Sequence, residues 1–434
     1  MSGSALPEAP SVFARRGFML DVSRGKVPRL ETLCRLVDRL SEHGYNHLQL
    51  YGERSFDYGE ATPPPFLRAD EVRRLDGYCA AKGLELAANQ NSLGHMERWL
   101  TDPHFRDLAE LPDGGAITPW GTVQEEPTGL QAASAEALEF LGHLYDRLLP
   151  NFHSKDVNVG CDEVFDLGKG RSQPFCREVG GEGELFLRHI EGIAALLARH
   201  GKRPLLWADM ILKHPEIAPC LPEGTIALVW GYEADHPFRE QCRILSESGV
   251  EFWVAPGTSS WRSFAGRSSN MAINVRRALE SGREFGATGM LLCDWGDAGH
   301  AQPIDASYPA IAYAAALARG QGMDTFRFSA EERSWFALGD AYRALGVSCA
   351  NSTALFRRLI GLSTPPFDTQ AMVREARLLS PEGVDCEAFE LARDLMLWAA
   401  GERVDGLEER YRRYWLKYNQ PAGLEESLRK IRLA

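Results

Sequence analysis

The sequence predicts a TIM (β/α)8 barrel followed by a C-terminal helical extension, in a chain of 434 residues. Short apolar runs alternate with stretches of helical period from about residue 15 to residue 320. There are eight such runs, and eight parallel strands close a barrel of this kind. The runs are apolar throughout, as in strands that are covered on both faces.

The elements follow one another in a regular order. Pro28 opens the first helix, because its fixed φ suits a first turn, and Gly44 ends that helix. Residues 101–133 are rich in Pro and Gly and predict a long loop. We expect strands at 17–22, 47–51, 84–89, 156–160, 204–208, 226–230, 252–255 and 289–293, and further helices at 70–82, 134–149, 184–200 and 308–318.

The domain organisation follows from where the strand pattern begins and stops. We expect an N-terminal lead-in over residues 1–14 and a catalytic barrel over residues 15–320. After about residue 320 only helical periods remain, so residues 321–434 are predicted to form the helical extension.

Composition excludes several classes of protein and partner. A hydrophobic content of 44% excludes a disordered chain, and a net charge of −12 argues against nucleic-acid and anionic-membrane partners. The nine cysteines form no CxxC or Cys/His spacing, so we expect no metal, no cofactor and no disulfide framework. With no leader pattern and no long apolar run, we expect a cytoplasmic protein without membrane contact. The oligomeric state stays open.

The ends of the strands carry the polar residues that point to chemistry. Asp162 and Glu163 directly follow a buried strand, and two adjacent carboxylates in different environments can supply acid and base at neutral pH. The competing interpretation of such a pair is a solvated loop. The seventh strand ends without a carboxylate at residues 254–259, which favours a nucleophile that belongs to the substrate.

Aromatic residues are interleaved with these polar groups at the strand ends. Trp rings stack on sugar faces, while carboxylates and arginines bind hydroxyls, so the pattern is typical of a sugar pocket. Asp21, Arg24 and Asp209 also follow strands. The candidate binding residues are Glu53, His95, Trp207, Trp230, Tyr232, Trp261, Asp294, Trp295 and Asp297.

Five segments, in order along the chain, resemble glycoside hydrolase family 20, the β-N-acetylhexosaminidases. They are residues 16–24, 48–58, 91–100, 158–172 and 293–303. The resemblance implies that Glu163 is the general acid/base and that Asp162 holds the 2-acetamido group, whose oxygen then attacks the anomeric carbon. It also implies that Arg16 binds O3 and O4, Asp297 binds O4 and O6, and Glu53 and His95 lie in the mouth. Trp207, Trp230 and Trp295 would surround the sugar.

The chain departs from the family pattern in three places. Residues 257–267 contain no Tyr to bind the acetamide oxygen, a role that Tyr232 or Trp261 could take. The residue before Asp162 is Cys161, where Gly is usual. The small α/β domain that commonly precedes the barrel is not seen, because the first strand begins within the first twenty residues. These differences indicate a divergent subgroup.

Three functions are consistent with the sequence. The first is an exo-acting retaining β-N-acetylhexosaminidase that removes terminal GlcNAc or GalNAc from a carbohydrate. The second is a β-glycosidase for a non-acetylated sugar that uses Glu53, Asp294 or Asp297 as a second carboxylate. The third is a sugar-binding barrel without catalysis.

Overall fold

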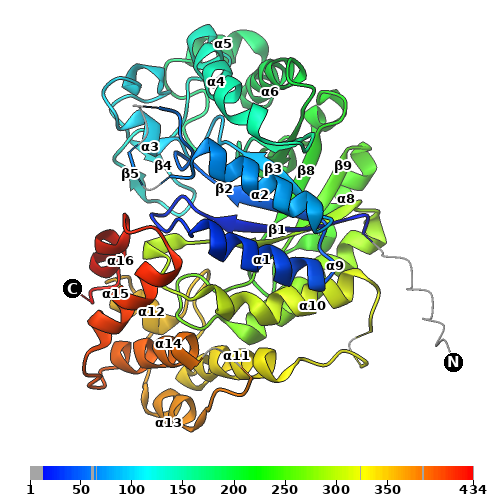
Figure 1. Ribbon diagram of the computed structural model, residues 1–434. Coiled ribbons are helices and arrows are strands. Elements are labelled where there is room, and N and C mark those ends of the chain that lie inside the picture. Colours follow the sequence, from blue (N-terminus) through cyan, green and yellow to red (C-terminus); the bar gives the residue numbers. More distant parts are fainter. Residues whose placement is uncertain (1–12, 60–62, 65, 323, 384–385, 434) are drawn as a thin grey trace, which may run out of the picture.

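Eight parallel strands close into a barrel in the order β1-β10-β9-β8-β7-β6-β3-β2 (Figure 1). The computed structural model describes residues 13–59, 63–64, 66–322, 324–383 and 386–433. The predicted barrel is confirmed, and each predicted strand is present. The strands are β1 (Arg15–Asp21), β2 (His47–Tyr51), β3 (Glu85–Asn89), β6 (Asp156–Asn158), β7 (Arg203–Trp207), β8 (Ile226–Trp230), β9 (Glu251–Ala255) and β10 (Gly289–Asp294).

Helices cover the outside of the barrel, and their apolar faces pack on the strands. In α1, for example, Leu33, Leu36 and Leu40 are all buried at helical spacing. The helices over the barrel are α1 (Leu30–Glu42), α2 (Ala69–Ala81), α3 (Glu97–Leu100), α4 (Ala135–Leu148), α5 (Gln173–Val179), α6 (Glu182–Ala198), α7 (Asp209–Lys213), α8 (Phe238–Ser248), α9 (Ser268–Phe285) and α10 (Tyr308–Ala318).

The region expected to be one long loop, residues 101–133, contains a small hairpin. Its strands β4 (Ala116–Ile117) and β5 (Val123–Gln124) pair antiparallel at the left edge of Figure 1, beside α3. The loop prediction is wrong in this respect. Strands of two residues are too short to show an alternating pattern in the sequence.

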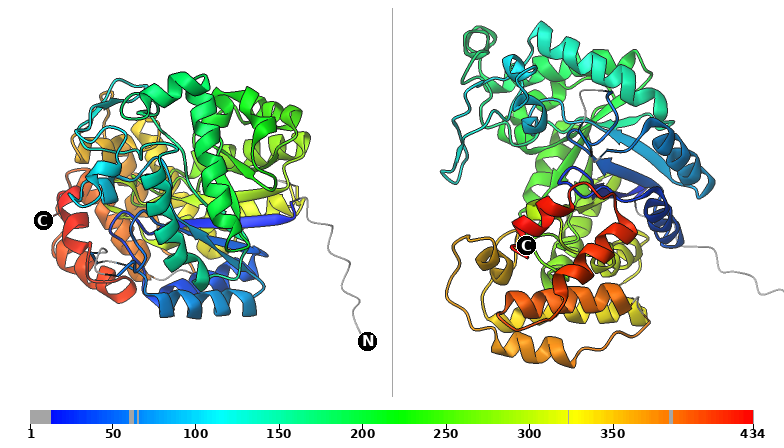
Figure 2. Two further views of the ribbon diagram at one scale, coloured as in Figure 1. Left: turned by 90° about the horizontal axis from the view of Figure 1, so that it is seen from above. Right: turned by 60° about the vertical axis from the view of Figure 1, so that its left-hand side comes forward.

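The C-terminal helices lie together on one side of the barrel (Figure 2). Their buried side chains, including Trp335, Phe389 and Trp415, form one apolar cluster that also takes in Phe264 and Ala301 from the barrel loops. The apolar cluster of the C-terminal helices therefore extends across the predicted boundary at residue 320 into the barrel loops. The helices are α11 (Ala330–Asp340), α12 (Ala354–Leu359), α13 (Gln370–Leu378), α14 (Cys386–Ala399), α15 (Leu407–Tyr418) and α16 (Leu424–Lys430).

Two further apolar layers surround the barrel strands. One lies between the strands and the outer helices, and the other fills the barrel interior with side chains such as Trp207, Trp253 and Leu291. Among the residues that the structure describes, no helix is both long and apolar enough to span a bilayer.

Candidate active site

A pocket of about 320 Å³ lies at the mouth of the barrel, where the carboxyl ends of the strands meet. Seven of the predicted site residues contribute to its lining: His95, Asp162, Glu163, Trp230, Tyr232, Trp295 and Asp297. The pocket is also lined by Arg24, Tyr51, Gly231, Glu233, His236 and Asn351.

Asp162 and Glu163 stand on a strained turn directly after β6. Gly160, Cys161 and Glu163 have φ values of 69°, 67° and 51°, a region that non-glycine residues rarely adopt. The turn is held by Asn158 Oδ1, which accepts a bond from Gly160 N–H at 3.0 Å. Strain of this kind persists only where the surroundings impose it, and here it aims two adjacent carboxylates into one pocket.

His95 lies against both carboxylates. Its Nε2 atom is 3.4 Å from Asp162 Oδ2 and 3.3 Å from Glu163 Oε2. Burial opposes a charge on the ring, but the Asp162 carboxylate and the neighbouring polar groups outweigh it and raise the pKa of His95 well above its usual value. This raised pKa favours the charged form of the His95 ring beside the two carboxyl groups.

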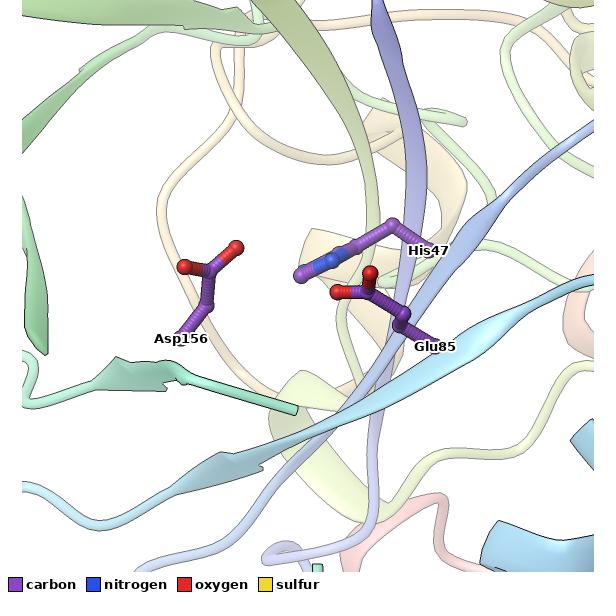
Figure 3. A group of neighbouring side chains, drawn as sticks. All are labelled: His47, Glu85 and Asp156. Carbon is purple, nitrogen blue, oxygen red and sulfur yellow. The ribbon is translucent and has the colours of Figure 1, made fainter. Parts of the chain in front are cut away.

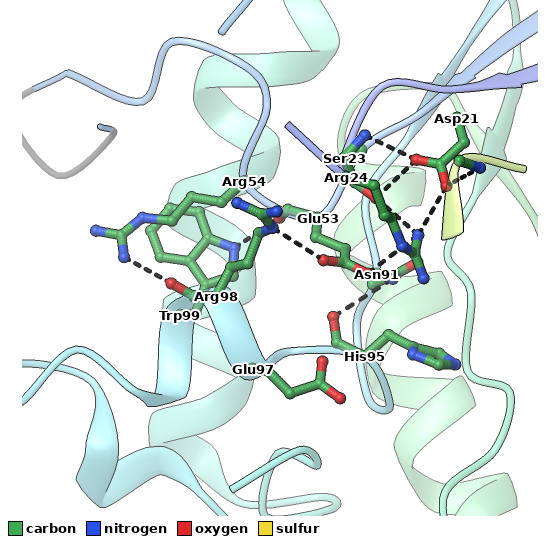
Figure 4. A network of polar contacts seen from close by, with 12 residues as sticks. Asp21, Ser23, Arg24, Glu53, Arg54, Asn91, His95, Glu97, Arg98 and Trp99 are labelled. Carbon is green, nitrogen blue, oxygen red and sulfur yellow. Dashed lines mark hydrogen bonds and ion pairs between the residues drawn. The ribbon is translucent and has the colours of Figure 1, made fainter. Parts of the chain in front are cut away.

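Arg24 organises the other side of the mouth (Figure 4). Its guanidinium lies 3.1 Å from Asp21 Oδ2 and 3.3 Å from Glu53 Oε1, and its carbon is 5.0 Å from the centre of the Tyr51 ring. Asp21 also accepts a bond from the backbone N–H of Gly296, which follows β10. These contacts tie the ends of β1, β2 and β10 together around one partly buried cation.

Asp209, at the start of α7, lies behind the turn that carries Asp162 and Glu163 and accepts a bond from Glu163 N–H at 2.9 Å. Burial, and then the nearby Asp162 carboxylate, raise the pKa of Asp209 to about 7. A carboxyl that keeps its proton near neutral pH adds no second full charge beside Asp162.

Aromatic rings form one wall of the pocket. Tyr232 lies between Trp230 and Trp295, with ring centres 5.6 Å and 6.3 Å away. The Trp295 ring is also 4.6 Å from Tyr51 and 5.5 Å from the Arg24 guanidinium carbon. The pocket thus combines aromatic rings with carboxyl groups, the combination that binds a sugar ring.

The segment beyond the barrel also reaches the pocket. Asn351, which precedes α12, lines it and accepts a bond from Trp261 Nε1 at 2.7 Å. Its backbone N–H donates to Glu233, which is held by a two-bond ion pair with Arg267. Ser427 of α16 donates to the carbonyl oxygen of Gly299, two residues after Asp297.

The expectation that Arg16 binds the sugar is wrong. Arg16 lies at the amino end of β1, and its guanidinium donates to the carbonyl oxygens of Gly44 and Phe13 at 2.7 and 2.9 Å. In a parallel barrel this end is opposite the mouth. Arg24, at the other end of the same strand segment, is the arginine that lines the pocket.

Four other predicted residues lie behind the pocket surface. Trp207 and Trp261 are each 1% exposed and belong to the barrel interior. Asp294 is buried under Thr258, Ser260 and Ser307, whose hydroxyls donate to its carboxylate. Glu53 reaches the pocket through Arg24 and Tyr51, which both contact its Oε1, while its Oε2 is 3.3 Å from Arg98 Nε. The two tryptophans and the two carboxylates support the lining without forming it.

A second group of titratable side chains lies at the floor of the barrel (Figure 3): His47, Glu85 and Asp156, with ligating atoms within 4.8 Å of one another. Each carboxylate already faces an arginine, Arg15 at 3.0 Å from Glu85 and Arg203 at 2.7 Å from Asp156. The floor is thus a charge-balanced cluster.

Hydrogen bonds fix the protonation of His47 in that floor. Asn158 donates to Gln49 Oε1, so the Gln49 amide nitrogen faces His47 Nε2 at 2.9 Å and must donate to it. The ring proton therefore sits on Nδ1, a buried atom without a hydrogen-bond partner among the described residues. Burial lowers the pKa of His47 to about 4, which keeps the ring neutral.

A family model described as glycosyl hydrolase family 20, catalytic domain, matches residues 13–259, more than half of the chain. The chain belongs to glycosyl hydrolase family 20. Human Hexosaminidase D is 28% identical over 250 residues, covering 54% of this family 20 chain and 47% of the human protein. Beta-hexosaminidase of Akkermansia muciniphila is 24% identical over 223 residues, covering 45% and 44%. The chain therefore spans less than half the length of these relatives.

Solved structures of family 20 share the fold. The chitobiase of Flavobacterium johnsoniae matches with a TM-score of 0.59 at 15% identity, over 93% of this chain and 66% of that one. The exo β-N-acetylglucosaminidase of Vibrio harveyi matches with a TM-score of 0.56 at 14% identity, over 75% and 57%.

Proposed function

We propose that this family 20 chain is an exo-acting retaining β-N-acetylhexosaminidase in which the 2-acetamido oxygen of the substrate is the nucleophile. The observation that carries the proposal is the placement of Asp162 and Glu163 on one side of a pocket, with His95 against both. The names of the relatives, Hexosaminidase D and Beta-hexosaminidase, support the same activity.

Asp162 is suited to hold the acetamido group. Its side chain is 9% exposed, and Oδ1 is buried with no hydrogen-bond partner among the described residues. A buried carboxylate oxygen without a partner is a strong acceptor for an N–H group. By accepting from the acetamide N–H, Asp162 orients the acetamide oxygen toward the anomeric carbon and stabilises the positive charge of the oxazolinium intermediate.

Glu163 is suited to move the proton. Its side chain is 31% exposed, more than Asp162, so it faces the outer part of the pocket where a leaving group departs. Glu163 would protonate the leaving oxygen and then take a proton from the water that opens the oxazolinium ion, with net retention. The His95 cation balances the carboxylate that forms after the first transfer.

The remaining lining residues would hold the sugar. Trp230 and Trp295 present ring faces, and Arg24 and Asp297 lie where hydroxyls would need a donor and an acceptor. Tyr232 lines the pocket and Trp261 does not, so we assign to Tyr232 the contact with the acetamide oxygen. Walls on several sides favour binding of one terminal sugar.

The second-carboxylate mechanism has less support. Of Glu53, Asp294 and Asp297, only Asp297 lines the pocket. Burial raises the pKa of Asp297, while Arg24 opposes that rise.

The test is hydrolysis of chromogenic β-glycosides of GlcNAc, GalNAc, glucose and galactose. We expect turnover of only the N-acetylated sugars, with inhibition by a thiazoline analogue of the intermediate. Glu163→Gln should lower kcat by about 100-fold or more, the usual contribution of a general acid. Turnover of the glucosides and galactosides would instead support a mechanism with a second protein carboxylate. No turnover of any of the four glycosides would support a barrel that binds sugar without catalysis.

A further inference from the structure

The β4–β5 hairpin carries exposed apolar side chains that the pocket does not use. Trp120 is 66% exposed, Ile117 is 62% exposed and Val123 is 54% exposed. Exposed leucines and valines are common, but a large aromatic ring held in water at a hairpin tip is a typical mark of a binding surface.

The hairpin tip is rigidly built around Trp120. Gly121 N–H donates to Thr118 O at 2.9 Å, and Thr118 N–H donates to Thr122 O at 2.9 Å. Pro119 presets the first central position of this turn, and Gly121 takes a φ of 82° that suits glycine. The tryptophan is therefore presented by an ordered turn, which lowers the entropy lost when a ligand stacks on it.

The hairpin is anchored to the two loops that carry the catalytic pair and His95. Leu130 N–H donates to Leu93 O, and Met96 N–H donates to Thr128 O, both at 2.9 Å. Gly129 N–H donates to Asp166 Oδ2 at 3.1 Å. The base of the hairpin segment thus joins the His95 loop to the segment that follows Glu163.

Trp120 also contacts that segment directly. Its ring lies 5.5 Å from the Phe165 ring at 84°, an edge-to-face pair. Phe165 N–H donates to Glu163 O at 2.9 Å, so Phe165 and the proposed acid Glu163 lie in one tight turn. The exposed Trp120 ring is therefore linked through Phe165 to the turn that carries Glu163.

We propose that Trp120 and Phe165 form a subsite for the sugar on the leaving-group side of the bond that is cleaved. The inference rests on the proposed function, because a general acid must touch the leaving oxygen. Neither ring lines the pocket, so a sugar bonded to that oxygen would extend past Glu163 and out of the pocket to reach them. The ligand is a β-linked glycan whose second sugar stacks on Trp120.

The experiment compares a β-linked disaccharide of N-acetylhexosamine with the methyl β-N-acetylhexosaminide, whose leaving group is too small to reach Trp120. Trp120→Ala should lower kcat/KM for the disaccharide about tenfold, a change of about 1.4 kcal/mol, and leave the methyl glycoside unchanged. Trp120→Phe should restore most of the loss. Leu378→Ala is the matched control, since Leu378 is 83% exposed on α13.

Other outcomes overturn the inference. An equal loss on both substrates would mean that Trp120 only supports the fold, and no loss on either would exclude the subsite. If Trp120→Ala converts a dimer to a monomer in light scattering without a selective loss on the disaccharide, the hairpin binds a second copy. If the wild type cleaves the methyl glycoside but Trp120→Ala is not selective, the proposed function stands and the subsite fails. No turnover of either substrate by the wild type would refute both the proposed function and the subsite.

Discussion

Arg16 and Arg24 flank one strand, yet only one of them faces the pocket. Arg24→Ala removes the cation that neutralises Asp21 and Glu53, and breaking such a buried pair typically costs about 3–5 kcal/mol. We expect Arg24→Ala to lower kcat/KM by at least about 100-fold and to lower the Tm. Arg16→Ala, the matched control, should lower the Tm alone. Similar kinetic losses in both variants would contradict this assignment.

Asp209 predicts a pH effect on stability. Its pKa is about 7 in the folded chain and about 4 when unfolded, so between these values the folded state holds a proton that the unfolded state has lost. Stability from this group is present at pH 4 and is lost as the pH rises toward 7. Asp209→Asn keeps an oxygen for Glu163 N–H and removes the titration. The Tm of Asp209→Asn minus the Tm of the wild type should be larger at pH 8 than at pH 5. The same Tm difference at both pH values would refute the effect.

The loops after β3 and β6 pack closely, and this packing positions the catalytic pair. A Cβ atom on Gly94 would lie 2.2 Å from the Asp162 backbone oxygen, so Gly94→Ala must displace the turn that carries Asp162 and Glu163. We expect a fall in kcat of at least about tenfold, since small displacements of reacting groups are costly.

Gly77→Ala is the matched control for that substitution. Gly77 lies in α2 with no atom within 4 Å of an added Cβ, and alanine favours helix by about 0.5–1 kcal/mol. This variant should be fully active with an equal or higher Tm. If Gly94→Ala were equally active, the contact between the two loops would not position the pair.

A residue beyond the barrel, Asn351, also lines the pocket. The family model ends at residue 259, whereas Trp295, Asp297 and Asn351 line the pocket beyond it. A chain truncated after residue 320 would expose the apolar cluster that includes Phe264 and Ala301. We expect it to be insoluble or inactive.

A milder variant tests the same idea without unfolding the chain. Ser427→Ala removes the bond from α16 to Gly299 O, two residues after Asp297. It should raise KM while the far-UV spectrum stays unchanged, because the rim that carries Asp297 loses one support. Full activity of the truncated chain would show that the C-terminal helices are independent of the site.

Much of the fold follows from local patterns in the amino-acid sequence. The eight strands could be predicted because each is an apolar run bounded by polar and glycine residues, a signal that depends on neighbouring residues only. The prominence of Asp162 and Glu163 has the same origin, since their position directly after a buried strand is visible in one short segment.

Contacts between segments that are distant in the sequence could not be predicted from these local patterns. Several features of the site depend on which segments meet in space. They are the direction in which Arg16 and Arg24 point, the burial of Trp207 and Asp294, and the position of Asn351 at the pocket. A tryptophan at a strand end has the same local sequence signal whether it faces the interior or the pocket. Closure of the barrel and packing of the C-terminal helices decide between them, because burial is a property of the assembled chain.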